Sequence, residues 1–399
     1  MFQSAPAYVR AARLALLSLG LLLSGCHAPW AGKLALAKPA VEAKLVWKHA
    51  APRQSEPGTF AVNVLPSAVA VCGDRVMAVS PNGTLTSLDK ITGSVVWTLA
   101  LKAGRFVSPL CVADGSESIA LANDVGMVFW VEKTGRLRWD TQVDSSIRSA
   151  PTFGNDLLFV QMTKGALVAL NTQTGRQMWT TSGDHLAPSI FQLELEQGPV
   201  FFDDVVYAGF PDGTLECYDS TTGSVLGSFG FPLQEGTFPH VGTPVITGGA
   251  LYVPHHTNGI YRFEVSEKKP FSSPTWSYLL YRMNNPHAGT VWADSSRKIV
   301  CTVLGVGGIH CLDANGHVLW RQLTWSLTSG LTAWNDMLIF SRKDNGIYGV
   351  RAETGAWMLH IPTQGKLVSK PVVAGDMLFF TDAKGSVSAY RLRPLQGPK

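Results

Sequence analysis

The chain has 399 residues, of which 46% are hydrophobic and 16% are charged. Its 33 Lys and Arg residues against 29 Asp and Glu residues give a formal net charge of +4, which argues against a polyanion-binding surface, nucleic acid included, and against an acidic tail. Gly, Pro and Trp are frequent and long helical periodicity is absent, which indicates a fold of strands and turns.

The first 25 residues resemble an export signal. Arg10 and Arg13 precede the apolar run "LALLSLGLLLSG" (14–25), which is too short to span a bilayer as a stable helix. The run ends at Cys26, and "LLSGC" (22–26) resembles the lipobox of bacterial lipoproteins. That resemblance implies cleavage before Cys26 and lipidation of its thiol and its new amino group. An ordinary signal peptide with an incidental cysteine is the alternative.

The residues after the cleavage point indicate a tether and a location. Removing the two leader arginines leaves 31 basic against 29 acidic residues, a net charge of +2. Several acyl chains hold a protein at a membrane where one alone is marginal. His27 follows the cysteine, where Asp would suggest inner-membrane retention, so the outer membrane is favoured. Residues 27–43 are rich in Ala and Pro, and we interpret 26–43 as the lipidated cysteine and its tether.

One strand-rich template recurs through residues 44–394. It contains an apolar strand, a Gly turn, a second apolar strand that ends near Asp, a Thr-Gly turn, and a strand that ends in Trp. The Gly turns are at Gly83, Gly126, Gly165, Gly213, Gly259, Gly307, Gly346 and Gly385. A repeat of about 40–50 residues is typical of a four-stranded propeller blade. The sequence therefore predicts an all-β, eight-bladed β-propeller of four-stranded antiparallel blades, in one domain.

The eighth repeat lacks a closing strand, and the N-terminus offers a spare one. The seven closing positions after the Gly turns are Trp97, Trp139, Trp179, Gly227, Trp276, Trp320 and Leu359. The last repeat ends at "SVSAYRLRP" (386–394) without one, whereas "KLVWKHA" (44–50) is a closing strand with nothing before it. We expect this N-terminal strand to complete the last blade and close the ring by main-chain hydrogen bonds. Residues 395–399 are then a C-terminal tail.

Six tryptophans at the ends of outer strands are interpreted as structural. An indole at this position can pack on the turn of the next blade, which buries a large apolar area and fixes the angle between blades. The residues are Trp47, Trp97, Trp139, Trp179, Trp276 and Trp320.

The pattern in "LTSLDKITGSVVW" (85–97) and "LVALNTQTGRQMW" (167–179) resembles the repeat of pyrroloquinoline-quinone-type propellers. That repeat is specific for fold and weak for function. With a lipobox and a bare eight-bladed ring, the chain is similar to the BamB family of outer-membrane assembly lipoproteins. The resemblance implies a non-enzymatic periplasmic scaffold, lipid-anchored to the outer membrane and monomeric within a complex. It also implies a protein partner, the periplasmic domains of the central barrel-assembly subunit.

The alternative is a periplasmic propeller that binds a small ligand, a metal or a quinone cofactor at its loop-rich face. The quinoprotein dehydrogenases hold their cofactor with a disulfide between adjacent cysteines, a calcium site and a catalytic Asp. No two cysteines of this chain are adjacent, and the long insertions of those enzymes are missing. We therefore assign no catalytic residue, no metal ligand and no cofactor, and we expect no enzymatic activity.

The longest connection on the loop-rich face is "SGDHLAPSIFQLELEQG" (182–198), between blades 3 and 4. Connections this long within a compact ring are often functional. In the resembled family it carries a Pro-Ser-Leu stretch and then a Leu-x-Leu-Arg-Gly stretch that contacts the barrel subunit. Pro188, Ile190, Leu193 and Leu195 match these positions and are the candidate partner-binding residues. The family's Arg and its acidic pair before the following blade are not matched, and a loop that packs on its own blade is the alternative.

Four histidines fall on the same face in blades 5 and 6. They are His240, His255, His256 and His287. Converging imidazoles could bind Zn²⁺ or Cu²⁺, but no acidic or Cys ligand accompanies them. Solvated loop histidines are the preferred interpretation.

Five cysteines remain beyond the lipobox, without CxxC spacing, and an exported protein can oxidise them. Aligning blade 6 with blade 3, in which Phe159 is expected to face Ala169, places Cys301 opposite Cys311. Opposed residues of antiparallel strands are within reach of a disulfide. Two buried thiols are nevertheless the preferred interpretation. Cys217 has no cysteine opposite it and is expected to remain a thiol.

Overall fold

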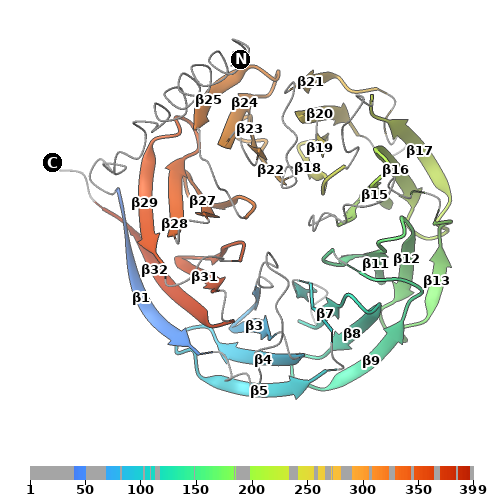
Figure 1. The fold of residues 1–399 in the computed structure, drawn as a ribbon, viewed down its shortest axis with the longest axis horizontal. Helices are drawn as coiled ribbons and strands as arrows, with labels where there is room; N and C mark the ends of the chain where they lie inside the picture. The colour runs from blue at the N-terminus through green and yellow to red at the C-terminus, as the bar shows by residue number, and fades with distance from the viewer. Residues whose placement is uncertain are drawn as a thin grey trace, which may run out of the picture. The chain divides into compact units, whose positions relative to one another are not determined.

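Figure 1 shows a computed structural model of the chain. The structure describes residues 40–50, 69–80, 83–101, 104–107, 109–112, 117–147, 149–183, 185, 198–232, 241–255, 259–265, 271, 273–279, 290–304, 308–322, 329–342, 346–363, 369–382 and 385–395. All of them lie in the compact unit Pro39–Lys399. The described residues contain no helix that is long and apolar enough to cross a membrane.

The strands of the described residues form eight four-stranded antiparallel sheets, which surround a central axis as blades (Figure 1). Within each blade we letter the strands A to D from the axis outward. Blade 1 contains β2 (Ala70–Cys72), β3 (Arg75–Val79), β4 (Thr84–Asp89) and β5 (Val95–Ala100). Blade 2 contains β6 (Leu110–Cys111), β7 (Ile119–Ala122), β8 (Met127–Val131) and β9 (Leu137–Gln142). Blade 3 contains β10 (Thr152–Gly154), β11 (Leu157–Gln161), β12 (Leu167–Asn171) and β13 (Gln177–Thr180).

The remaining blades follow the same order. Blade 4 contains β14 (Val200–Phe202), β15 (Val205–Gly209), β16 (Thr214–Asp219) and β17 (Val225–Gly230). Blade 5 contains β18 (Val245–Thr247), β19 (Ala250–His255), β20 (Gly259–Glu264) and β21 (Trp276–Tyr278). Blade 6 contains β22 (Thr290–Asp294), β23 (Ile299–Leu304), β24 (Gly308–Asp313) and β25 (Val318–Gln322). Blade 7 contains β26 (Thr332–Trp334), β27 (Met337–Arg342), β28 (Gly346–Arg351) and β29 (Trp357–Pro362).

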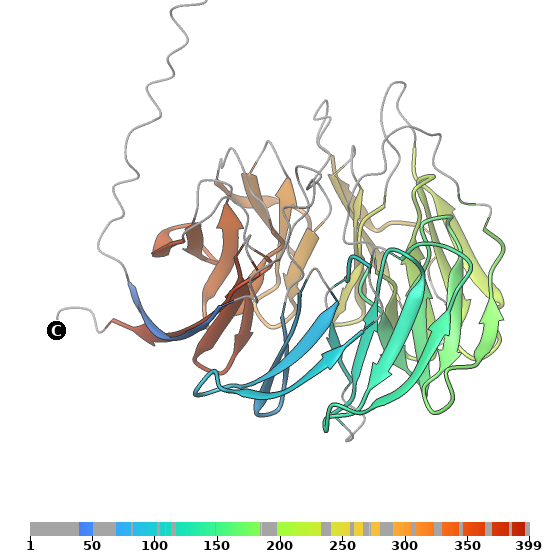
Figure 2. The same ribbon diagram turned by 60° about the horizontal axis from the view of Figure 1, so that its bottom comes forward.

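Blade 8 combines both ends of the propeller. It contains β30 (Val372–Ala374), β31 (Met377–Thr381), β32 (Val387–Pro394) and, as its D strand, β1 (Val41–His49). In Figure 2 the blue strand β1 lies along the red strand β32. The predicted closure of the ring by the N-terminal strand is therefore confirmed, although β1 begins at Val41 rather than at residue 44.

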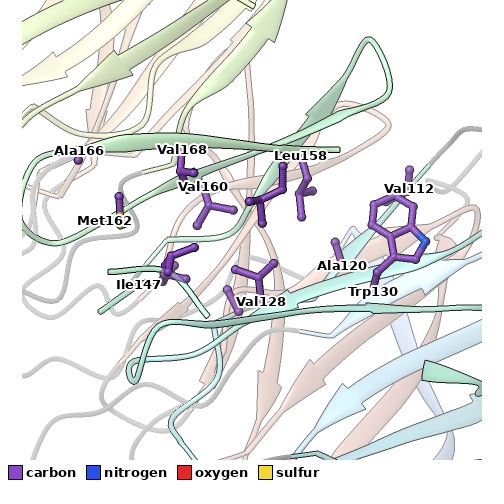
Figure 3. Close-up of a cluster of buried hydrophobic side chains, with 13 residues drawn as sticks. Val112, Ala120, Val128, Trp130, Ile147, Leu158, Val160, Met162, Ala166 and Val168 are labelled. Carbon is purple, nitrogen blue, oxygen red and sulfur yellow. The ribbon is translucent and has the colours of Figure 1, made fainter. Parts of the chain in front are cut away.

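Each interface between neighbouring blades holds a hydrophobic cluster, and the inner strands read as apolar runs because both of their faces are buried. In β11, Leu158 and Val160 face blade 2, whereas Leu157 and Phe159 face blade 4. Figure 3 shows the blade 2–3 cluster, in which Val128 and its neighbours point toward Val160 and Val168. The period of two along a strand thus supplies two interfaces at once.

The C–D turns explain the "D…TG" part of the repeat. In blade 1 the Asp89 carboxylate accepts hydrogen bonds from the backbone N–H groups of Ile91 and Thr92, at 3.1 and 2.8 Å, and from the Thr92 hydroxyl. These bonds, led by the Thr92 amide, lower the pKa of Asp89 below its usual value. Gly93 closes the turn at a φ of 72°, which favours glycine.

The closing tryptophans lie directly on the turn glycine of the next blade. A Cβ atom at Gly175 would come within 2.7 Å of the Trp139 ring, and the same relation joins Trp47 to Gly93. Each indole N–H also donates to a backbone carbonyl of that turn, at 2.7–3.1 Å. The donors are Trp47, Trp97, Trp139, Trp179, Trp276 and Trp320. The indole ring therefore packs in the space that the absence of a side chain at the turn glycine leaves open.

Blade 7 has no closing tryptophan, and the topology of the ring explains why. Its closing position is Leu359, and the next blade takes its D strand from the N-terminus, so blade 8 has no C–D turn for an indole to cover. Instead, the backbone N–H of Ala40 donates to the Met358 carbonyl at 3.1 Å, and Val41 joins the same cluster as Leu359. The start of β1 thus packs against the end of blade 7, where the other blades meet the C–D turn of the next blade.

The B–C glycines mostly follow the prediction. Among the predicted turn residues, Gly83, Gly126, Gly165, Gly213, Gly259 and Gly385 have φ angles between 80 and 98°. Gly346 begins β28 without a positive φ. Gly307 lies outside the described residues, next to Gly308 with a φ of 88°.

The cysteines form two disulfides in the described residues. Cys301 lies opposite Cys311, as the alignment with the Phe159–Ala169 pair predicts, and the two are bonded, so the preference for buried thiols is wrong. The second disulfide joins Cys72 of β2 to Cys111 of β6 and was not predicted. It links the inner strands of blades 1 and 2. Cys217 is a buried free thiol, as predicted.

Candidate functional site

The predicted partner-binding residues belong to the connection between blades 3 and 4. Pro188, Ile190, Leu193 and Leu195 lie outside the described residues, as does the predicted lipidation site Cys26, and their roles stay predictions. Within the connection, the structure describes residues 182, 183, 185 and 198.

A continuous group of aromatic rings joins blades 3 and 4, the two blades that the connection links. Phe159 lies 5.9 Å from Trp179 and 5.9 Å from Phe201, measured between ring centroids. Tyr218 lies 6.4 Å from Trp179 and 6.5 Å from Phe210. Such pairs add to the stability that area burial alone provides. The connection therefore starts from a rigid interface.

His185, at the start of the connection, binds the B–C turn of blade 4. Its ring stacks on Phe210 with centroids 4.0 Å apart and planes 16° from parallel. Nδ1 lies 2.8 Å from an Asp212 carboxylate oxygen and 3.1 Å from the Thr214 hydroxyl. Nε2 lies 3.2 Å from a Glu216 carboxylate oxygen. Both edges of the ring and one of its faces are thus engaged by blade 4.

The backbone of His185 passes closely over the B–C turn of blade 3. A Cβ atom at Gly165 would lie 2.5 Å from the His185 carbonyl oxygen, and Gly165 has a φ of 80°. No other residue type meets both demands. The chain at His185 therefore touches blade 3 with its backbone and blade 4 with its side chain.

Glu216 is held from below by a buried tyrosine. The Tyr218 hydroxyl donates to the same Glu216 oxygen that faces His185. Burial first, and then this bond to Glu216, raise the pKa of Tyr218, so its hydroxyl remains a donor. Between them, Cys217 points to the opposite face of the strand, where burial raises the pKa of its thiol to about 12.

The far end of the connection is also tied to its surroundings. The backbone N–H of Gly198 donates to the Thr243 hydroxyl at 2.9 Å, just before blade 5. The Thr152 hydroxyl of blade 3 donates to the Pro199 carbonyl. Both ends of the 182–198 connection are therefore fixed by side chains of neighbouring blades.

Of the four histidines predicted to share one face of the propeller, the structure describes His255, and its side chain is buried. His240, His256 and His287 lie outside the described residues. His255 is 1% exposed, belongs to β19, and lies 5.0 Å from the Phe231 ring. For His255 the interpretation as a solvated loop histidine is therefore wrong, because its ring is part of the blade 4–5 packing.

The residues that the structure describes form no metal site, because no group of three or more of their His, Cys, Asp or Glu side chains could hold an ion. Asp212 and Glu216 contact opposite edges of the His185 ring and so do not point at a common centre. The arrangement is suited to hold a chain segment in place.

Sequence reasoning missed His185 and its partners, although a signal was present. Asp212, Thr214 and Glu216 alternate in "FPDGTLE" (210–216), and alternate residues of a strand point to the same side. Asp212 in this turn and Glu216 on the strand that follows it, beside a connection that carries a histidine, were the available clue.

The comparisons with known proteins agree with the fold. The family model described as "Outer membrane protein assembly factor BamB" matches residues 39–128, 116–303 and 305–393. The outer membrane protein assembly factor BamB of Burkholderia pseudomallei is 26% identical over 371 residues, covering 89% of this chain and 90% of that protein. That of Yersinia pestis is 21% identical, covering 80% and 82%.

Solved structures show the same architecture. The crystal structure of BamB from Moraxella catarrhalis aligns with a TM-score of 0.70 at 16% identity, covering 82% of this chain and 99% of that one. A quinohemoprotein alcohol dehydrogenase from Pseudomonas putida aligns with a TM-score of 0.61 at 11% identity, which shows a shared fold alone. Since the family model spans nearly the whole propeller, the chain belongs to the BamB family of outer membrane protein assembly factors, which are not enzymes.

Proposed function

We propose that the protein is a non-enzymatic scaffold that assists the assembly and insertion of β-barrel proteins into the outer membrane. The observation that carries this proposal is the match of the family model across residues 39–393. The closed ring supports it, because a propeller whose blades pack on one another presents rigid loops to a partner.

The proposed location follows from the leader. Cleavage before Cys26 and lipidation of that residue would anchor the chain at the periplasmic face of the outer membrane. The residues that lead up to β1 would then act as a tether, which lets the propeller reach a partner near the membrane.

The proposed partner is the periplasmic region of the central barrel-assembly subunit, contacted through the connection between blades 3 and 4. Leu193 and Leu195 would serve as its apolar anchors, because a few such side chains carry most of the binding energy of an interface. The fixed ends of the connection, at His185 and Gly198, support this role, since a segment held at both ends loses less entropy on binding.

A pull-down from solubilised membranes tests the function. The wild-type chain should recover the barrel-assembly subunit, and the double variant Leu193→Asp with Leu195→Asp should not. Recovery of no barrel subunit by the wild-type chain, together with a cofactor absorbance in the purified protein, would instead favour a ligand-binding or quinone-dependent propeller.

The matched control changes two exposed apolar residues of blade 1. Val95 and Val96 are 49% and 43% exposed on β5 of blade 1, which is separated from blade 3 by blade 2 (Figure 1). Val95→Asp with Val96→Asp should fold and recover the partner as the wild type does. If the leucine variant unfolds, the leucines belong to the core; if it folds and still recovers the partner, the binding surface lies elsewhere.

A further inference from the structure

We infer that His185 is a positioning residue for partner binding, which fixes the point at which the blade 3–4 connection leaves the propeller. This inference rests on the proposed function for its effect on affinity, and on the contacts of His185 alone for the anchoring itself.

The first argument is the number of independent contacts that one side chain makes. The imidazole stacks on Phe210, and its two nitrogens face Asp212 and Glu216. The side chains of His185, Asp212 and Glu216 are only 16%, 26% and 14% exposed, so these polar contacts are sheltered from water. Hydrogen bonds to charged groups in such surroundings are stronger than ordinary ones.

The second argument is that the receiving side is itself rigid. The Asp212 carboxylate also accepts bonds from the Thr214 N–H at 3.0 Å and from the Thr214 hydroxyl. Glu216 accepts a bond from the buried Tyr218 hydroxyl. Phe210 is fully buried at the blade 3–4 interface. His185 therefore binds groups that are already fixed by other contacts.

The third argument is geometric. The His185 backbone passes over Gly165 of blade 3, and its side chain reaches the equivalent turn of blade 4. One residue thus spans two adjacent blades at the face where the connection departs. We expect that without this anchor the chain would lose more conformational freedom when the partner binds, and that this entropic cost would weaken the complex.

Limited proteolysis of the full-length protein tests the anchoring without a partner. A glutamate-specific protease can cut after Glu194 or Glu196, within the connection. His185→Ala should be cut there about tenfold faster than the wild type, because residue 185 would detach from blade 4 more often. His185→Phe, which keeps a ring on Phe210 but makes no hydrogen bond, should be cut faster as well.

The matched control is a histidine–carboxylate pair on another blade. His317 lies 3.2 Å from Asp313 in the C–D turn of blade 6, and its side chain is 78% exposed. His317→Ala should leave the cleavage rate within the connection unchanged. Equal cleavage of wild type, His185→Ala and His185→Phe would overturn the inference.

Partner affinity tests the positioning. Binding of the barrel subunit's periplasmic region should weaken about tenfold in His185→Ala and stay at the wild-type level in His317→Ala. His185→Arg should restore most of the affinity, because a planar cation stacks on aromatic rings and donates to two carboxylates. A merely structural loss would not be rescued in this way.

The outcomes separate the inference from the proposed function. Faster cleavage with unchanged affinity in His185→Ala would overturn the positioning role and leave the scaffold function intact. If the wild-type chain itself binds no barrel subunit, the proposed function fails, and the cleavage comparison still decides whether His185 anchors the connection.

Discussion

At the scale of single residues, the contact between an indole and a turn glycine joins neighbouring blades. Trp139 covers Gly175 and donates to the Thr172 carbonyl at 2.7 Å. The Asn171 side chain accepts bonds from Thr174 and so shapes the same turn. Three positions of the repeat, the Asp or Asn, the Gly and the Trp of the preceding blade, therefore form one recognition unit.

A matched pair of glycine substitutions measures this unit. Gly175 and Gly375 have φ angles of 70 and 66°, so alanine meets similar backbone strain at both. A Cβ atom at Gly175 would strike Trp139 at 2.7 Å, whereas nothing lies within 4 Å at Gly375. Gly175→Ala should therefore cost about 1–3 kcal/mol more than Gly375→Ala, as overpacking does. Thermal unfolding of both variants checks this; equal melting temperatures would contradict it.

Cys217 allows a prediction about pH. Burial raises the pKa of its thiol to about 12, above the usual value near 8.5. Because the folded state holds the proton more tightly, the contribution to stability is complete below the ordinary thiol pKa and is lost as the pH rises toward 12. Native protein at pH 8 should thus resist alkylation by iodoacetamide. The mature protein, whose Cys26 thiol would carry the lipid, should take up one label at Cys217 when it is unfolded without reductant.

The control for this measurement is the same alkylation after reduction, which should also label Cys72, Cys111, Cys301 and Cys311. Rapid labelling of Cys217 in the folded protein at pH 8 would show that its thiol is accessible and not raised in pKa.

At the scale of elements, β1 is the strand on which closure depends. It pairs with β32 from Val41 opposite Pro394 to His49 opposite Val387. Trp47 joins the cluster between blades 8 and 1, where it lies 5.9 Å from Phe379. Lys48 adds an ion pair to the buried Asp382 at 3.1 Å.

Deleting residues 41–50 should therefore lower stability and solubility together. Loss of the buried Trp47 side chain alone costs about 3–5 kcal/mol, and the exposed edge of β32 becomes a site for aggregation. Trp47→Ala, which keeps the strand, should destabilise without the loss of solubility. Differential scanning calorimetry and gel filtration check both variants, and a deletion variant with the wild-type melting temperature and elution volume would exclude this role of β1.

At the scale of the whole molecule, the two disulfides act over different ranges. Cys72 and Cys111 are separated by 39 residues and belong to adjacent blades, whereas Cys301 and Cys311 are separated by 10 residues within one blade. In the chain-entropy account, stabilisation grows with the logarithm of the closed loop.

Removing the first disulfide, in Cys72→Ala with Cys111→Ala, should cost about 4 kcal/mol, and removing the second, in Cys301→Ala with Cys311→Ala, about 3 kcal/mol. Denaturant unfolding of both double variants gives the comparison. A larger loss for the pair in blade 6 would show that strain or packing, and not loop length, controls the difference.

Much of the fold could be predicted from the sequence because the same local pattern of residues recurs many times along the chain. The Gly turns and the "D…TG…W" pattern indicate the blades, and the spare "KLVWKHA" strand indicates how the ring closes. The register within a blade follows as well, since the turn length sets which residues face each other, as Cys301 and Cys311 do.

Contacts between different blades depended on the tertiary structure. The bond between Cys72 and Cys111 joins adjacent blades, and the binding of His185 to Asp212 and Glu216 joins the blade 3–4 connection to blade 4, at separations that no local pattern specifies. The burial of His255 also arises from packing between blades 4 and 5. The sequence of each repeat determines the local backbone conformation. The angle at which neighbouring blades pack determines which side chains meet across an interface, and this angle is known only from the tertiary structure.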